Sequence, residues 1–193
     1  MCQRLLGDAT LYLLLQRMDA DLAEQTRAAG CTACGEGALH SASYPRKPRG
    51  VAEAILPEGY ATRYSFCCAD EGCRKRTTPP SLRFLGRRVY VSAVVVLATA
   101  MRHGVTAWRA ARLRELTGAS LRTLARWRRW WTESFIAGPV WTQCRGRLRA
   151  PVDEATLPLS LLSVFDGAER ERLVALLRLL LPLTTSVLAE HAG

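Results

Sequence analysis

The sequence predicts a protein of the α + small β class, in which a cysteine-rich β region lies between helices. Apolar residues recur at helical spacing in the first 30 residues, again between residues 89 and 135, and near the C-terminus. The stretch from residue 31 to 80 is different, because it is rich in Gly, Pro, Ser, Tyr and Cys and has short, strand-like runs. Five of the seven cysteines lie in this stretch, which therefore holds the main candidate site.

Changes in composition divide the chain into five expected segments. They are an N-terminal helix (1–30), the cysteine-rich region (31–80), a helical segment (81–137), a basic linker (138–165) and a C-terminal helical segment (166–193). The first helix is expected from Asp8 to Ala29, where leucines recur at helical spacing, and Gly30 can end it.

Two cysteine clusters have the spacing of a metal site. Cys31 and Cys34 are three residues apart, and Gly35 lets the backbone turn tightly beneath an ion bound by both thiolates. A second cluster, CCADEGC at residues 67–73, follows after 32 intervening residues. Four sulfurs from two such clusters form a closed tetrahedral site, which suits structural Zn²⁺. The odd cysteine count without an export signal also favours metal over disulfides, in a reducing cytoplasm.

The second cluster has one cysteine more than the site needs. If residues 60–68 form a strand, Cys68 shares a face with Phe66, and Cys67 lies on the other face. The aromatic face should turn toward the core and the metal, so Cys68 is preferred and Cys67 is its substitute. His40 is an alternative ligand, and a set of buried thiols without metal is a further alternative. The predicted ligands are Cys31, Cys34, Cys68 and Cys73.

Basic residues are concentrated in the middle of the chain. The net charge is +10, and residues 74–149 hold 17 Lys or Arg against two acids, while the segments on both sides are slightly acidic. A localised basic block points to a polyanionic partner, and we expect double-stranded DNA. A membrane is not expected, because the most apolar run, residues 89–101, is too short to span a bilayer.

The basic block contains a candidate helix-turn-helix. Helices are expected over residues 89–102, 106–116 and 120–135, with a strand as the alternative for the first. Gly118 lies in the turn between the last two helices, and Ser120 can cap the last one. Glycine in such a turn, followed by a capping residue, is typical of helix-turn-helix motifs.

The last of these helices has an apolar face and a basic face. At about 100° per residue, arginines fall together on an arc that can reach guanine or phosphates in a major groove. A solvated basic face without a ligand is the alternative, and the tryptophans are expected to pack rather than to stack on bases. The residues predicted to contact DNA are Ser120, Arg122, Thr123, Arg126 and Arg129. The residues predicted to face the core are Leu121, Leu124, Trp131 and Phe135.

Other basic residues suit contacts with phosphates, which position a protein on DNA without specifying a sequence. They lie in the cysteine-rich region and just after it. The predicted phosphate contacts are Arg46, Lys47, Arg49, Arg74, Lys75, Arg76, Arg87 and Arg88.

The C-terminal segment carries an amphipathic pattern. A helix is expected to begin near Asp166, whose spacing to Glu169 matches a capping box. Its leucines form an apolar stripe that can mediate dimerisation or contact with a transposase, or can pack onto the first helix of the same chain. The stripe consists of Leu173, Leu176, Leu177, Leu180 and Leu181.

In content and order these motifs resemble the zinc-ribbon and helix-turn-helix modules of bacterial transposases and of transposon-associated accessory proteins. The resemblance covers roughly residues 31–136 and rests on CTACG at 31–35, YPRKPRG at 44–50 and GASLRTLARW at 118–127. It implies recognition of element ends or of a promoter, with zinc as a staple for the fold.

The resemblance stops before a catalytic domain. Transposases of this kind continue into an RNase-H-like domain with three separated carboxylates, whereas residues 138–193 offer a loop and a short leucine-rich segment. We therefore expect a DNA-binding accessory or regulatory protein of a mobile genetic element, not an enzyme. An RNA-binding zinc ribbon or protein-interaction adaptor is the alternative. A small metal-dependent nuclease is less favoured, because catalytic zinc needs an open coordination position.

Overall fold

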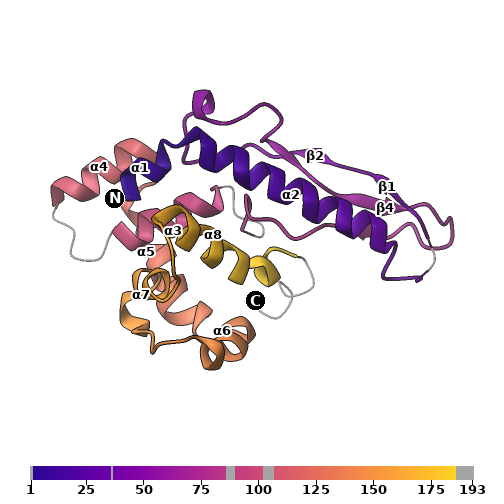
Figure 1. Cartoon of the computed structure of the whole chain (residues 1–193). Helices are drawn as coiled ribbons and strands as arrows, with labels where there is room; N and C mark the ends of the chain where they lie inside the picture. The colour runs from indigo at the N-terminus through magenta and orange to yellow at the C-terminus, as the bar shows by residue number, and fades with distance from the viewer. Residues whose placement is uncertain (1, 36, 86–89, 102–106, 186–193) are drawn as a thin grey trace.

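The computed structural model describes residues 2–35, 37–85, 90–101 and 107–185, without the side chains of residues 2, 3 and 107–110. In these ranges the protein is of the predicted α + small β class. Figure 1 shows a group of helices at one end and a small β region at the other, with the long helix α2 (Ala9–Ala29) running between them. Each end has its own apolar cluster.

Both ends of α2 are set by residues that the sequence predicts. The Asp8 carboxylate accepts hydrogen bonds from the backbone N–H groups of Thr10 and Leu11. Gly30 ends the helix with a φ of 75°, which residues with a Cβ atom rarely adopt. A short helix that was not predicted, α1 (Cys2–Leu6), precedes α2.

The β region consists of two small antiparallel sheets. One has the strand order β1-β4-β5, and the other pairs β2 with β3. The prediction of one strand over residues 60–68 is wrong, because the chain leaves one sheet for the other at Tyr64 and Ser65. The elements are β1 (Leu39–Ser41), β2 (Tyr44–Pro45), the 3-10 turn η1 (Glu53–Ile55), β3 (Thr62–Arg63), β4 (Phe66–Cys68) and β5 (Arg76–Thr77).

Helix α3 (Ser92–Met101) is the centre of the helical core. Its residues from 92 to 100 are all buried, which confirms the predicted buried helix and excludes a strand. The surrounding apolar cluster takes side chains from both ends of the chain, from Leu5 to Leu180. The four predicted segments outside the cysteine-rich region, residues 1–30, 81–137, 138–165 and 166–193, therefore all contribute side chains to one core. Residues 102–106, where the first predicted helix should end and the second should begin, lie outside the described residues.

Two helices of the basic block follow α3. Helices α4 (Ala107–Thr117) and α5 (Leu121–Arg129) are joined by a short turn in which Gly118 has a φ of 62°. The Ser120 hydroxyl caps α5 by accepting a hydrogen bond from a backbone N–H in its first turn at 3.2 Å. The helix continues to residue 135 as predicted, but its last part, η2 (Trp130–Phe135), is a π-helix.

The tryptophans of this region pack in the core, as expected. Trp127 and Trp131 are buried, and the Trp131 ring lies 4.9 Å from that of Phe135, between centroids. Tyr90 packs edge-on against Trp127 at 4.8 Å. Because they are buried, Trp127 and Trp131 are not accessible for stacking on a base.

The expected linker, residues 138–165, contains short helices. The preceding helix ends before residue 138 as predicted, but Pro139 begins a new helix, at a position where proline is well tolerated. Trp141 of this helix is buried and donates a hydrogen bond from Nε1 to the Glu154 carboxylate at 2.8 Å. The elements are α6 (Pro139–Cys144), the 3-10 turns η3 (Arg145–Arg147) and η4 (Glu154–Thr156), and α7 (Leu159–Ser163).

The C-terminal helix α8 (Glu169–Leu179), followed by the 3-10 turn η5 (Leu181–Thr184), begins later than predicted. The Glu171 carboxylate, not that of Glu169, accepts a hydrogen bond from the Ala168 N–H at 2.7 Å. Asp166 does not cap the helix and instead binds Arg149 at 2.8 Å.

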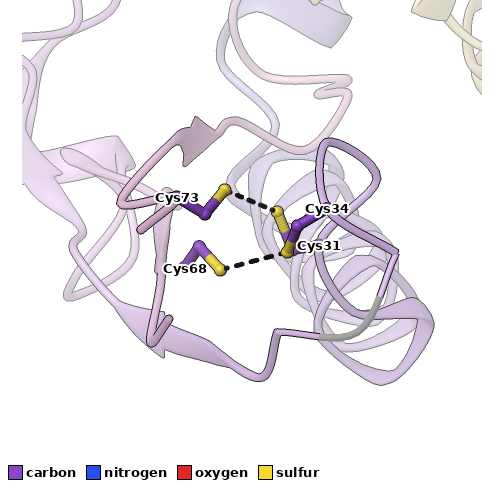
Figure 2. A group of neighbouring side chains, drawn as sticks. All are labelled: Cys31, Cys34, Cys68 and Cys73. Atoms are coloured by element: carbon purple, nitrogen blue, oxygen red, sulfur yellow. Dashed lines mark hydrogen bonds between the residues drawn. The ribbon is translucent and has the colours of Figure 1, made fainter. Parts of the chain in front are cut away.

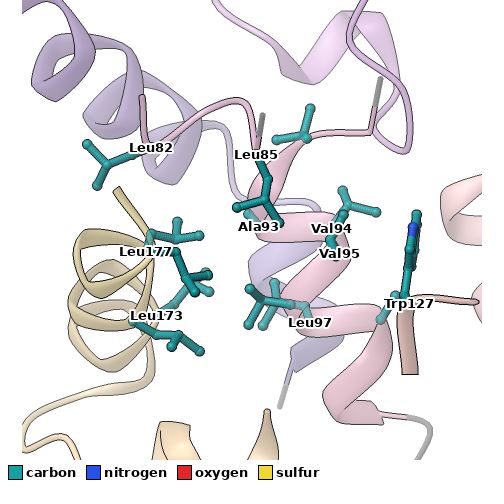
Figure 3. Close-up of a cluster of buried hydrophobic side chains, with 14 of the residues drawn as sticks. Leu82, Leu85, Ala93, Val94, Val95, Leu97, Trp127, Leu173 and Leu177 are labelled. Carbon is teal, nitrogen blue, oxygen red and sulfur yellow. The ribbon is translucent and has the colours of Figure 1, made fainter. Parts of the chain in front are cut away.

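The leucine stripe of α8 is used inside the chain. Figure 3 shows Leu173 and Leu177 facing α3, with Trp127 on the opposite side of α3. Leu176 and Leu180 are also buried in the same cluster. Intramolecular packing thus accounts for the stripe, although α8 packs mainly on α7 and α3 rather than on the first long helix.

Two buried arginines tie the β region to the helices. Arg83 donates from Nε to the Asp19 carboxylate of α2 at 2.8 Å, and from its terminal nitrogens to the carbonyl oxygens of Tyr60 and Thr62 at 2.7 and 2.9 Å. Arg63 donates to the Pro79 carbonyl at 2.5 Å. These contacts fix the path of residues 79–83 between the two apolar clusters.

Candidate metal centre and nucleic-acid interface

Four cysteine side chains meet at the C-terminal end of α2. The sulfur atoms of Cys31, Cys34, Cys68 and Cys73 all lie within 4.8 Å of one another (Figure 2). Two sulfur pairs, Cys31–Cys73 and Cys34–Cys68, are each 3.7 Å apart, whereas disulfide sulfurs are about 2.05 Å apart. The thiols are therefore free, and the group can hold a metal ion. This is the ligand set predicted from the sequence.

Two backbone turns bring these sulfurs together. In the first, the N–H of Gly35 donates to the Cys31 carbonyl at 2.8 Å, and Gly35 has a φ of 81°. In the second, the N–H groups of Cys73 and Arg74 donate to the Asp70 carbonyl at 3.2 and 3.0 Å. Arg74 has a φ of 46°, so an arginine occupies a left-handed conformation that costs it about 1 kcal/mol or more.

Gly37 is a part of the site that the sequence analysis missed. A Cβ atom at this position would lie 2.2 Å from the Cys68 sulfur and 3.1 Å from the Cys34 sulfur, so only glycine fits. Its carbonyl accepts a hydrogen bond from the Cys31 N–H at 2.9 Å. The sequence signal was a second glycine shortly after the first cysteine pair.

Neither alternative ligand belongs to the group. The Cys67 sulfur donates to the Arg74 carbonyl at 3.3 Å, on the other face of β4 from Cys68. His40 is exposed on β1, where it pairs with Cys67 across the sheet. The argument from strand alternation therefore selects the correct cysteine, although the strand is shorter than predicted.

The protein environment acts on two thiols in opposite directions. The backbone N–H groups of Cys34 and Ala33 donate to the Cys31 sulfur and lower the pKa of that thiol to about 6. Burial raises the pKa of the Cys68 thiol to about 12. Cys31 is thus ready to act as a thiolate ligand at neutral pH, whereas Cys68 must lose a proton when an ion binds.

The cysteine group is also the centre of the second apolar cluster. Cys31 and Cys68 are buried together with Leu39 and Phe66 of the sheet and Ala23 of α2. This cluster is small, so an ion bound there would supply much of the cohesion of the β region.

The exposed face of α5 carries the arginines predicted to contact DNA. Arg122, Arg126 and Arg129 are exposed, and Arg128, which falls near the apolar arc, is exposed as well. Leu124, Trp131 and Phe135 are buried as expected. The prediction that Leu121 faces the core is wrong, because 54% of its surface is exposed.

The positive charge of α5 is largely uncompensated. Among the residues that the structure describes, Arg122, Arg126 and Arg128 form no ion pair, and Arg129 lies 3.8 Å from the exposed Glu133 carboxylate. The other acid of the basic block, Glu115 on α4, binds Arg112 at 2.6 Å. Ser120 caps the helix, and its hydroxyl lies 3.0 Å from that of Thr123.

The predicted phosphate contacts outside α5 lie in the β region, and one of them, Arg49, is close to α5, because its backbone bridges to Tyr90, whose ring packs on Trp127. The group Arg74 to Arg76 is exposed after the last metal-site cysteine, and Arg76 lies over the Tyr44 ring. Lys47 and Arg49 are exposed, while Arg46 is half-buried with its guanidinium over the Phe84 ring. Arg87 and Arg88 lie outside the described residues.

Figure 1 shows α4 and α5 at one end of the molecule and β1 and β4 at the other. The Arg74 to Arg76 segment therefore does not form one compact patch with the arginines of α5.

None of the helices in the described ranges is long and apolar enough to cross a bilayer. No known protein family matches the chain, and neither a curated protein nor a solved structure is significantly similar to it.

Proposed function

We propose that the protein is a zinc-stabilised, sequence-specific binder of double-stranded DNA. The observation that carries this proposal is the exposed face of α5, where Arg122, Arg126 and Arg129 project from a capped helix that follows a tight turn. Within the described part of the chain, only Arg129 of these three has an ion-pair partner, the exposed Glu133 at 3.8 Å. A short turn between two helices, the second of them basic, is the arrangement with which helix-turn-helix proteins enter the major groove.

Charge supports a nucleic-acid partner for this face. Uncompensated arginines attract the phosphate backbone, and arginine can also bind guanine through two hydrogen bonds. Duplex DNA suits such a surface because it carries a negative charge on every phosphate, whereas a protein partner would need a matching cluster of acidic side chains.

The ion proposed for the cysteine group is Zn²⁺. A tetrahedral site with zinc–sulfur bonds of about 2.3 Å has sulfurs about 3.8 Å apart. Two of the sulfur pairs, Cys31–Cys73 and Cys34–Cys68, are 3.7 Å apart, close to that value. Four thiolates leave no open coordination position, so the proposed role of the ion is structural and the proposed activity is binding, not catalysis.

The β region supplies a second, sequence-independent contact in this proposal. Arg74, Lys75 and Arg76 follow Cys73 directly, so the ion would fix the start of this basic segment.

An accessory or regulatory role in a mobile genetic element is proposed from the resemblance to transposase modules. A transposase or a second copy of the chain remains the proposed protein partner. Because the leucine stripe of α8 is buried, such a partner would have to bind another surface.

Selection from a random duplex library tests sequence-specific binding. We expect the zinc-loaded protein to enrich a defined site, and Arg122→Ala with Arg126→Ala to abolish the enrichment. Arg4→Ala with Arg17→Ala is the matched control, since it removes the same charge from exposed positions on α1 and α2. Enrichment of single-stranded or structured RNA instead of duplex DNA would replace the proposal with the RNA-binding alternative.

A further inference from the structure

Leu121 is an exposed apolar residue on the first turn of α5. With 54% of its surface accessible, it is more exposed than the other exposed large apolar residues, Leu13, Leu14 and Leu159, at 38%, 36% and 44%. An apolar side chain of this size costs free energy in water unless a partner covers it. Its neighbours on the helix indicate which partner would do so.

Leu121 belongs to a narrow apolar strip framed by arginines. At about 100° per residue, Ala125 lies one turn further along the same face, and it is exposed too. On one side of Leu121 and Ala125 lies Arg128, and on the other lie Arg122, Arg126 and Arg129. The buried arc of Leu124, Trp127 and Trp131 begins beyond Arg128, with Leu124 about 60° from Leu121 around the helix axis.

We infer that this strip contacts the C5-methyl groups of thymines in the major groove, an inference that rests on the proposed binding of duplex DNA. Thymine is the base that presents a methyl group in the major groove, and apolar side chains recognise it by contact. The arginines on both sides hold the strip against DNA by binding phosphates or guanines.

The dimensions of the strip fit adjacent base pairs. Leu121 and Ala125 are four residues apart, so they are separated by about 6 Å along the helix. Successive base pairs are about 3.4 Å apart. The strip therefore spans about two base-pair steps and can reach thymines within three successive base pairs.

Replacement of thymine by deoxyuracil tests the inference, because it removes the methyl group and leaves the base pairing intact. The probe is the duplex selected by the wild-type protein, with each thymine replaced in turn. We expect about a fourfold loss of affinity at one or two positions, the value of one buried methyl group. Leu121→Ala should bind the parent duplex about tenfold more weakly and should show no further loss with deoxyuracil at the position that Leu121 contacts.

Leu159→Ala is the matched control, since it truncates another exposed leucine, on α7. It should bind the parent duplex and the deoxyuracil-substituted duplexes with the same affinities as the wild type. If the wild-type protein binds the selected duplex with the same affinity after every thymine replacement, the inference is overturned while duplex binding stands. The inference is also overturned if Leu121→Ala remains as sensitive to deoxyuracil as the wild type. If no duplex is bound at all, the proposed function itself fails.

Discussion

The Arg83 guanidinium lies 2.8 Å from the Asp19 carboxylate, and both side chains are fully buried. Asp19 also accepts hydrogen bonds from the Ser81 hydroxyl at 2.5 Å and from the Leu82 N–H at 2.6 Å. Arg83 extends the network to the carbonyls of Tyr60 and Thr62. One ion pair therefore joins α2, the chain before α3 and the β region, and it fixes the metal centre relative to the helical core.

Breaking this pair is expected to destabilise the whole fold. Asp19→Ala leaves the Arg83 charge buried without its partner, so we predict a loss of about 3–5 kcal/mol in the free energy of unfolding. Urea denaturation at neutral pH measures this loss in the free energy of unfolding. Asp21→Ala, an exposed acid on the same helix, should change the free energy by less than about 0.5 kcal/mol. Equal effects of the two substitutions would show that the buried pair does not organise the fold.

Substitution of Gly37 should abolish metal binding. In Gly37→Ala the new Cβ atom would overlap the Cys68 sulfur, since their distance would be 2.2 Å, so the four sulfurs cannot keep their arrangement. We expect at least a tenfold loss of zinc affinity, measured by competition with a chelator. Gly146→Ala is the control, because a Cβ atom there meets nothing within 4 Å. Wild-type affinity in Gly37→Ala would contradict the geometry of the site.

The two turns of the metal centre predict opposite effects of glycine exchange. Arg74→Gly relieves a left-handed arginine and should stabilise the zinc-loaded protein by about 1 kcal/mol, whereas Gly35→Ala introduces the same strain and should destabilise it by about that amount. Lys75→Gly removes the same charge as Arg74→Gly but relieves no backbone strain, so it should not stabilise the zinc-loaded protein. Thermal unfolding with zinc present compares the three variants.

Removal of the metal is expected to unfold the β region and to leave the helical core. The cysteine group holds its own small apolar cluster, while α3 is buried in the larger one. After chelation, amide hydrogen exchange should accelerate in residues 37–77 and remain slow in α3. One equivalent of zinc per chain is expected, and Cys68→Ser should lose it while Cys67→Ser should keep it.

Acid should have the same effect as chelation. Binding requires thiolates, and burial raises the pKa of the Cys68 thiol to about 12, so its proton competes with the ion throughout the neutral range. Zinc affinity is therefore predicted to fall as the pH falls and to rise as it rises. An affinity that does not change between about pH 5 and pH 8 would contradict a four-thiolate site.

Local signals account for what the sequence predicted correctly. Asp8 and Gly30 set the ends of α2, and Ser120 caps α5, because capping depends on backbone groups a few residues away. Strand alternation distinguishes Cys68 from Cys67 for the same reason, since it concerns a three-residue strand.

Features that depend on distant parts of the chain were missed. The burial of Arg83 follows from its contact with Asp19, 64 positions earlier, and nothing in the nearby sequence indicates it. Gly37 is required by a sulfur from a different strand. Leu121 lies near the buried Leu124 in angle around the helix axis. The angle alone does not reveal whether another element of the fold covers a side chain at that position. Asp166 had capping spacing, yet binds Arg149 from another segment.

The most direct test of the account is the salt dependence of duplex DNA binding by the zinc-loaded protein and by Arg122→Ala with Arg126→Ala. The account predicts that the affinity of the wild type falls linearly with salt on logarithmic axes. The double variant should bind more weakly. For each of the two arginines that contacts a phosphate, the slope of log affinity against log salt concentration should be smaller by about 0.9. If an arginine contacts a base instead, its loss should remove the preference for a sequence. Identical binding curves for the two proteins, or no binding to duplex DNA, would contradict the assignment of α5 as the DNA-binding helix.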